Sequence, residues 1–218
     1  MQKPPEGVGT GRILKNSRRT LGRLKAHPKA KALAPKLQAP HNALKKANVA
    51  VTDADDALQD AAAAVDVCDA LAREALTDCQ LILVAVTRRD YKSPTYLAVF
   101  PNGFDAAKKK SGAELRDELT GVVEHIETLE KTSPLQAHVK PLKACISAYT
   151  GPLAEDAKAS KAATLADTNL SVARAEWLLA FDGLYGDVRS MFPGRRALAE
   201  SFFPEWSRKT EKPVKLGE

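Results

Sequence analysis

The chain has 218 residues, of which 44% are hydrophobic, 28% are charged and only 6% are aromatic, and its formal net charge is +6. This length fits one domain, or one domain with tails. No stretch approaches the ~18 uninterrupted apolar residues of a membrane span, so none is expected. Alanine, the residue with the highest helix propensity, is abundant, and the composition therefore predicts an all-α fold.

The positive charge is concentrated at the N-terminus. Residues 1–31 contain nine Lys or Arg and one acid, whereas the rest of the chain carries 24 basic and 26 acidic residues. We therefore predict a basic arm with an interrupted helix over 1–40, an elongated helical bundle over 41–203 and a basic C-terminal tail over 204–218. The helix of the arm is expected over about 13–37, broken near Pro28 and Pro35.

The N-terminus also bears on location. SRRTLGR at Ser17–Arg23 is similar to a twin-arginine export signal, but LKAHPKAKA follows it instead of an apolar segment. An organelle transit peptide has a comparable arginine-rich, acid-poor composition and stays an alternative. We expect a cytoplasmic protein, whose three cysteines are small buried residues in a reducing compartment.

The longest run without glycine or proline extends from His41 to Ser93 and predicts one long helix. A seven-residue repeat runs through it without a break. One position of the repeat holds Leu44, Val51, Leu58, Val65, Ala72, Cys79 and Val86, and the other holds Ala47, Ala54, Ala61, Cys68, Ala75 and Ile82. These are the a and d positions of a coiled coil.

A second long helix is predicted over about 152–191 by the same pattern. Its larger series is Ala163, Leu170, Trp177, Leu184 and Met191, and its smaller series is Ala159, Ala166, Ala173 and Ala180. Small residues along a seam allow two helices to approach closely. We expect the two alanine rows to face each other.

Between the long helices, two shorter helices are predicted by apolar residues at three- and four-residue spacing. They carry Leu115, Leu119, Val122, Ile126 and Leu129, and Leu135, Val139, Leu142, Ile146 and Tyr149. The short turn over 131–134 predicts an antiparallel hairpin. If the two helices of this hairpin run away from the end of the first long helix and back to it, the two long helices are antiparallel. At one end of the pair, we expect Ile82 and Val86 to lie beside Ala159 and Ala163. At the other end, we expect Leu44 and Ala47 to lie beside Leu184 and Met191.

The hairpin is too short to cover both halves of the long pair. The apolar stretch around Trp177–Tyr185 therefore needs another cover. The N-terminal helix, the C-terminal tail and a second subunit are the alternatives.

The sequence contains no convincing catalytic, metal or cofactor site. His125 lacks the Glu-x-x-His spacing of di-iron bundles, and the acidic run from Asp53 to Asp60 lacks the glycine of a calcium loop. Phosphate-binding loops, dinucleotide fingerprints and nucleophile elbows are absent from the sequence. We therefore expect a protein that is not an enzyme and needs no cofactor or metal.

The two ends of the chain carry the candidate partner-binding residues. They are Arg12, Lys15, Arg18, Arg19, Arg23, Lys25, Arg195, Arg196 and Trp206. Such basic density attracts acidic protein surfaces or phosphate backbones. The alternatives are a solvated tail and docking of the arm onto the protein's own body. For Phe192, Phe202 and Phe203 we expect capping of the open end of the bundle.

LYGDVRSMFPGRRALAESFF, residues 184–203, resembles the ending of uncharacterised bacterial helical proteins that close with Leu-Tyr-Gly, Phe-Pro-Gly-Arg and Ser-Phe-Phe. The resemblance implies a bacterial origin and a helical fold, and no activity. The sequence thus favours an alanine-rich structural, assembly or adaptor protein that acts through protein–protein contacts or self-association. A protein that binds nucleic acid through residues 1–31 is the alternative.

Overall fold

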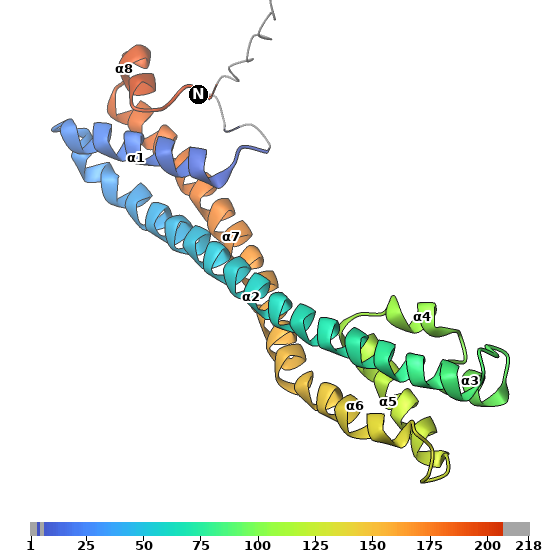
Figure 1. The fold of residues 1–218 in the computed structure, drawn as a ribbon. Helices are drawn as coiled ribbons and strands as arrows, with labels where there is room; N and C mark the ends of the chain where they lie inside the picture. Colours follow the sequence, from blue (N-terminus) through green and yellow to red (C-terminus); the bar gives the residue numbers. More distant parts are fainter. Residues whose placement is uncertain (1–3, 5–6, 207–218) are drawn as a thin grey trace, which may run out of the picture. The chain divides into compact units, whose positions relative to one another are not determined.

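The computed structural model describes residue 4 and residues 7–206, and all regular structure in this part of the chain is helical. The elements in chain order are α1 (Thr10–Ala26), the 3-10 helix η1 (Ala30–Leu33), α2 (Ala34–Val86), α3 (Pro94–Val99), α4 (Phe104–Lys108), α5 (Gly112–Thr128), α6 (Gln136–Ala148), α7 (Thr150–Met191) and α8 (Arg196–Ser201) (Figure 1). The all-α prediction is confirmed. None of the described helices is long and apolar enough to cross a membrane.

The chain forms two compact units, and each is described by itself. Unit 1 comprises residues 1–53 and 165–218, and unit 2 comprises residues 54–164. Both long helices, α2 and α7, contribute to each unit. This division differs from the predicted boundaries at residues 40 and 203, because the N-terminal helix and the C-terminal segment share one core with the nearest parts of α2 and α7.

Unit 2 contains the predicted hairpin. The helices α5 and α6 pack side by side against the second half of α2 (Figure 1). Leu115, Leu119, Leu135 and Leu142 are fully buried in this core with Leu76 of α2. The apolar spacing seen in the sequence thus places one face of each helix in a common core.

The direction of the last long helix follows from contacts along α2. Cys68 Sγ lies 3.6 Å from the carbonyl oxygen of Ala148, and Tyr149 donates a hydrogen bond to Asp69. About one turn further along each helix, the side chains of Val65 and Leu153 both lie next to Gly112. As residue numbers rise along α6 and α7 they fall along α2, so the predicted antiparallel arrangement is confirmed.

The predicted register at this end is wrong. The start of α7 lies beside residues 65–69 of α2, and Ile82 lies in the core formed with the α5–α6 hairpin, not beside Ala159. The register differs because of the segment over 87–111, whose path the sequence did not predict. Its Tyr96, Val99 and Phe100 are buried in the unit 2 core, and this segment returns the chain along α2 before α5 begins.

Both ends of α2 also differ from the prediction. The helix begins at Ala34 and continues through Pro40, because Leu37 and Leu44 on either side are fully buried and one missing backbone hydrogen bond is tolerated. It ends at Val86, where Arg88 and Arg89 adopt positive φ angles of 53° and 65°. The amide of Arg89 closes the end by donating to the carbonyl of Val84 at 2.8 Å.

Apart from Val86, the heptad positions of the two long helices are buried or half-buried. In α2, Ala54 and Ala61 are half-buried between exposed neighbours, and in α7, Ala166 and Ala173 are buried. The helix α7 begins at Thr150 and ends at Met191, close to the predicted 152–191. The seven-residue pattern fails near the end of α2, where Val86 is exposed and the fully buried Leu76 and Leu83 lie outside both series. It also did not fix the register.

In unit 1, α1 lies across the nearest parts of α2 and α7 (Figure 1). Its Ile13, Leu21 and Leu24 share a core with Trp177 and Phe181 of α7. The C-terminal segment closes the same core with the buried aromatic residues Phe192, Phe202, Phe203 and Trp206. The capping predicted for the three phenylalanines is thus observed, and α1 and the C-terminal segment both cover the apolar part of α7.

Candidate partner-binding surface of unit 1

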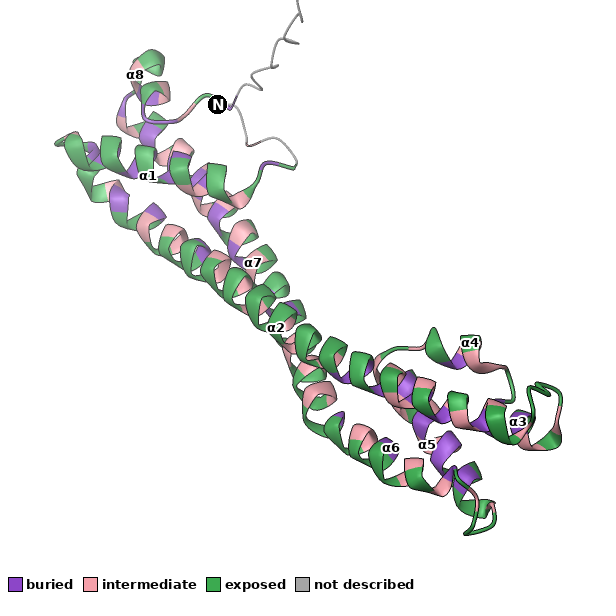
Figure 2. Cartoon of the chain, viewed as in Figure 1, coloured by how far each residue is buried: buried purple, intermediate pink, exposed green. Residues whose placement is uncertain are grey.

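The helix α1 has two chemically different faces. Its buried face holds Ile13, Asn16, Ser17, Thr20, Leu21 and Leu24. Its outer face holds the exposed cations Arg12, Lys15, Arg18, Arg19, Arg23 and Lys25, and the helix contains no acid (Figure 2). Because the buried face is fixed in the core of unit 1, the folded helix presents these cations together on one side.

The charge of the whole chain follows the two units. Counted over the sequence, unit 1 carries 20 basic and 10 acidic residues, a net charge of +10. Unit 2 carries 13 basic and 17 acidic residues, a net charge of −4. An anionic partner is therefore attracted to unit 1 and repelled by unit 2.

A chain of polar contacts fixes α1 to both long helices. The indole Nε1 of Trp177 donates to Ser17 Oγ at 2.9 Å, and His41 Nδ1 lies 3.0 Å from the same hydroxyl. Burial lowers the pKa of His41, and the neighbouring cations Lys45, Arg18 and Lys25 lower it further. The neutral imidazole is thereby favoured, and its Nδ1 forms a hydrogen bond with the same Ser17 hydroxyl that accepts from the indole.

Two arginines connect α1, and the residues just before it, to the rest of unit 1. Nη1 of Arg23 donates to the carbonyl oxygens of Ser201 at 2.7 Å and Phe203 at 3.2 Å, at the C-terminal end of α8. Nη2 of Arg174 in α7 donates to the carbonyl oxygen of Val8 at 2.7 Å. Docking of the arm onto the protein's own body, one of the sequence-based alternatives, is thus observed, and it leaves the other cations of α1 on the outside.

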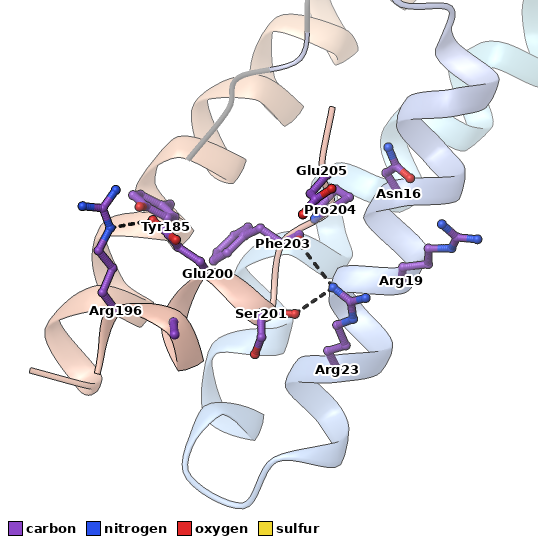
Figure 3. A pocket seen from close by; sticks show the side chains of 11 residues that line it. Asn16, Arg19, Arg23, Tyr185, Arg196, Glu200, Ser201, Phe203, Pro204 and Glu205 are labelled. Carbon is purple, nitrogen blue, oxygen red and sulfur yellow. Dashed lines mark hydrogen bonds and ion pairs between the residues drawn. The ribbon is translucent and has the colours of Figure 1, made fainter. Parts of the chain in front are cut away.

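Between α1 and α8 lies a cavity of about 920 Å³ (Figure 3). It is lined by Asn16, Arg19, Arg23, Tyr185, Arg196, Ala197, Glu200, Ser201, Phe203, Pro204 and Glu205. Its volume lies within the range of about 300–1,000 Å³ usual for ligand sites. Three arginines and two carboxylates line it, and its polarity makes it a site for a charged group.

The arginines of the cavity differ in what they already bind. Arg23 is held by the two carbonyl oxygens, and Nε of Arg196 donates to Glu200 Oε1 at 2.9 Å (Figure 3). This hydrogen bond lowers the pKa of Glu200. Arg19 is exposed and makes no hydrogen bond or ion pair within the described residues. Among the described residues, it is the arginine of the cavity with no protein partner.

The structure brings together three of the nine candidate residues predicted from the sequence, namely Arg19, Arg23 and Arg196. Arg12, Lys15, Arg18 and Lys25 share the outer face of α1, and Arg195 is exposed at the start of α8. Trp206 is only 1% exposed and packs against Trp177 and Phe181, so its place is in the core. The sequence predicts a surface anchor at Trp206 because it does not show which core an aromatic residue near a chain end closes.

Sequence reasoning missed several residues of the cavity. Asn16, Tyr185, Glu200 and Glu205 come from three separate stretches of the chain, and no spacing rule connects them. The one signal available was Asn16 itself, a carboxamide on the face of α1 that also holds the apolar Ile13, Leu21 and Leu24. Among the described residues, His, Cys, Asp and Glu form no group of three that could hold a metal ion.

No family model, curated protein or solved structure matches the chain. The resemblance of residues 184–203 to the ending of bacterial helical proteins therefore stays a prediction.

Proposed function

We propose that this chain is a non-enzymatic adaptor or assembly protein that binds an acidic surface of a protein partner through the outer face of α1. The observation that carries this proposal is the arrangement of α1, which presents six exposed cations and no acid from a helix packed into a core. A cationic surface that is already folded loses less conformational entropy on binding than a flexible tail does.

A matched pair of charge variants tests the proposal. One variant carries glutamine in place of Lys15, Arg18, Arg19 and Lys25 on α1, and the control carries glutamine in place of Lys92, Lys109, Lys131 and Lys140 of unit 2, all exposed. Both lose the same formal charge. Each tagged protein is incubated with a nuclease-treated extract of its source organism, and the retained proteins are identified by mass spectrometry.

The proposal expects acidic proteins to be retained by the wild type and by the unit 2 variant and to be lost from the α1 variant. Retention of the same proteins by the α1 variant would show that the helix is not the binding surface. Circular dichroism of both variants checks that their helix content is unchanged.

A second candidate is a protein that binds the phosphate backbone of nucleic acid through the same helix. It is favoured by the density of cations on α1. Because the described residues of this helix include no aromatic side chain for base stacking, the contact would be with the backbone and not with the bases. Its test is a salt series with duplex DNA. Backbone binding predicts a steep loss of affinity with salt that disappears in the α1 variant, and an equal salt slope in both variants would exclude it.

A further inference from the structure

We infer that the cavity between α1 and α8 is the specific part of the binding surface, and that it receives an acidic side chain together with the adjoining backbone of a partner peptide. This inference rests on the proposed function and names the chemistry that the partner must offer. It starts from one residue, Asn16, which lines the cavity from the buried side of α1.

Asn16 is only 6% exposed, and its carboxamide makes no hydrogen bond within the described residues. The buried polar atoms that lack a partner and are sealed from solvent belong to Thr20, His27 and Trp206, and Asn16 is not among them. Its amide is thus buried against the protein but accessible from the cavity. An amide that no protein group satisfies and that is open to the cavity can donate to, and accept from, a ligand bound there.

The positive charges of the cavity lie on the same helix as this amide. Arg19 and Arg23 follow Asn16 at three and seven residues, so all three project from one side of α1 (Figure 3). The two carbonyl contacts of Arg23 hold that side chain in place, and Arg19 is available. An amide donor beside a guanidinium matches a carboxylate, which accepts several hydrogen bonds at once.

The carboxylates of the cavity favour a peptide as its ligand. Glu200 and Glu205 line the same cavity as the arginines. A nucleic-acid strand carries an anion at every step and offers few donors along its backbone, so these carboxylates repel it. A peptide backbone offers an N–H group at every residue other than proline, and carboxylates accept from such groups.

The aromatic residues of the cavity give the same result. Tyr185 packs edge-on against Phe203 with ring centroids 5.2 Å apart, and Phe203 is 6% exposed. The Phe203 ring is therefore too buried for base stacking, and Arg189 lies over the ring of Tyr185, 5.9 Å from its centroid. The cavity therefore favours an extended acidic peptide segment over a single-stranded nucleic acid.

The test uses a short fluorescein-labelled peptide of alternating glutamate and glycine as the probe, with fluorescence polarisation as the readout on the full chain. Arg19→Gln is expected to weaken binding about tenfold or more, because it removes a charge-assisted hydrogen bond. Arg18→Gln and Lys25→Gln are the matched controls, because they remove the same charge from the same helix outside the cavity. Both controls are expected to weaken binding by less than about threefold.

Asn16→Ala provides a second variant, with the same expected loss of peptide binding, and thermal unfolding confirms that it is folded at the assay temperature. Equal weakening by Arg19→Gln and Arg18→Gln would overturn the inference, because it would show uniform attraction to the helix. Competition by duplex DNA at equal phosphate and carboxylate concentration, with the same loss in Arg19→Gln, would also overturn it in favour of nucleic acid. If Arg19→Gln binds the peptide normally while the four-charge α1 variant still loses its proteins, the cavity inference fails and the proposed function stands.

Discussion

The hydroxyl of Tyr149 donates a 2.7 Å hydrogen bond to Oδ1 of Asp69, a carboxylate that is only 2% exposed. The same oxygen accepts from the amide of Gly112 at 2.8 Å, and Oδ2 accepts from Arg73 at 3.1 Å. Arg73 in turn donates to the carbonyl oxygens of Lys108 and Lys110. The carboxylate thus joins α2 to the start of α5 and to the junction of α6 and α7, and it fixes the register within unit 2.

Replacing Tyr149 by phenylalanine removes one donor from this buried carboxylate. We expect the free energy of unfolding to fall by about 1–3 kcal/mol, because a buried acceptor loses a hydrogen bond that water does not replace. Urea unfolding followed by circular dichroism measures the change. Tyr91→Phe is the control, since Tyr91 is 53% exposed, and a comparable loss in both variants would show that the contact with Asp69 is not the cause.

Sequence patterns predicted the helices of unit 2 better than their connections. The burial of residues such as Leu115 and Leu142 is predictable from local spacing, because a helix repeats its buried face every three or four residues. The hydrogen bond between Tyr149 and Asp69 links residues 80 positions apart, and no local sequence pattern indicates it. The direction of the segment over 87–111, and with it the register of α7, depends on such distant contacts.

The thiol of Cys79 is expected to be unreactive in the folded protein. Burial raises its pKa from 9.0 to about 12, so the nucleophilic thiolate is scarce at pH 8. Because the pKa is raised in the folded state, the contribution of this group to stability is present below pH 9 and is lost as the pH rises from 9 towards 12. Iodoacetamide labelling at pH 8, read by peptide mass spectrometry, should modify Cys79 far more slowly in the native protein than in urea. Equal rates would contradict its burial.

Ser17 is expected to be essential for docking α1. In Ser17→Ala the buried indole of Trp177 loses its acceptor, and we expect a loss of about 1–3 kcal/mol in unfolding free energy. Ser190→Ala, at an exposed serine of α7, serves as the control. Chemical denaturation followed by tryptophan fluorescence measures both variants, and an unchanged midpoint for Ser17→Ala would argue against the contact.

His41 reports the positive field around α1. Its pKa lies below 6.5 because of burial and of Lys45, Arg18 and Lys25, so its contribution to stability is present above pH 6.5 and is lost as the pH falls. We predict that Lys45→Gln raises this pKa, and an NMR titration of the imidazole Cε1 proton follows it. Lys46→Gln is the neighbouring control. Titration of wild-type His41 at or above pH 6.5 would contradict the packing described.

The alanine seam can be tested in unit 1. Ala173→Leu is expected to cost about 1–3 kcal/mol, because Ala173 is 8% exposed within the core that contains Trp177. Ala175→Leu is the control, since Ala175 is exposed on the same helix. The neighbouring Arg174 is not a suitable control position, because its side chain donates a hydrogen bond to the carbonyl oxygen of Val8. Equal thermal stability of the two variants would place the seam elsewhere.

The candidate binding surface was predictable in its charge and not in its shape. The cations of α1 all fall within residues 12–25, so their density was visible without a structure. The cavity joins Arg19 to Arg196, which lie far apart in the chain, and the burial of Trp206 depends on Trp177 and Phe181. Tertiary packing alone decides which of these residues lie on the surface.

The most direct test of the binding surface is an NMR titration of the ¹⁵N-labelled full chain with the glutamate–glycine peptide. We predict shift changes in the amides of α1 and α8, in the side-chain amide of Asn16 and in the Nε–H of Arg19, with the signals of α5 and α6 unchanged. Shift changes centred on unit 2, or none at peptide concentrations that saturate the polarisation signal, would contradict it.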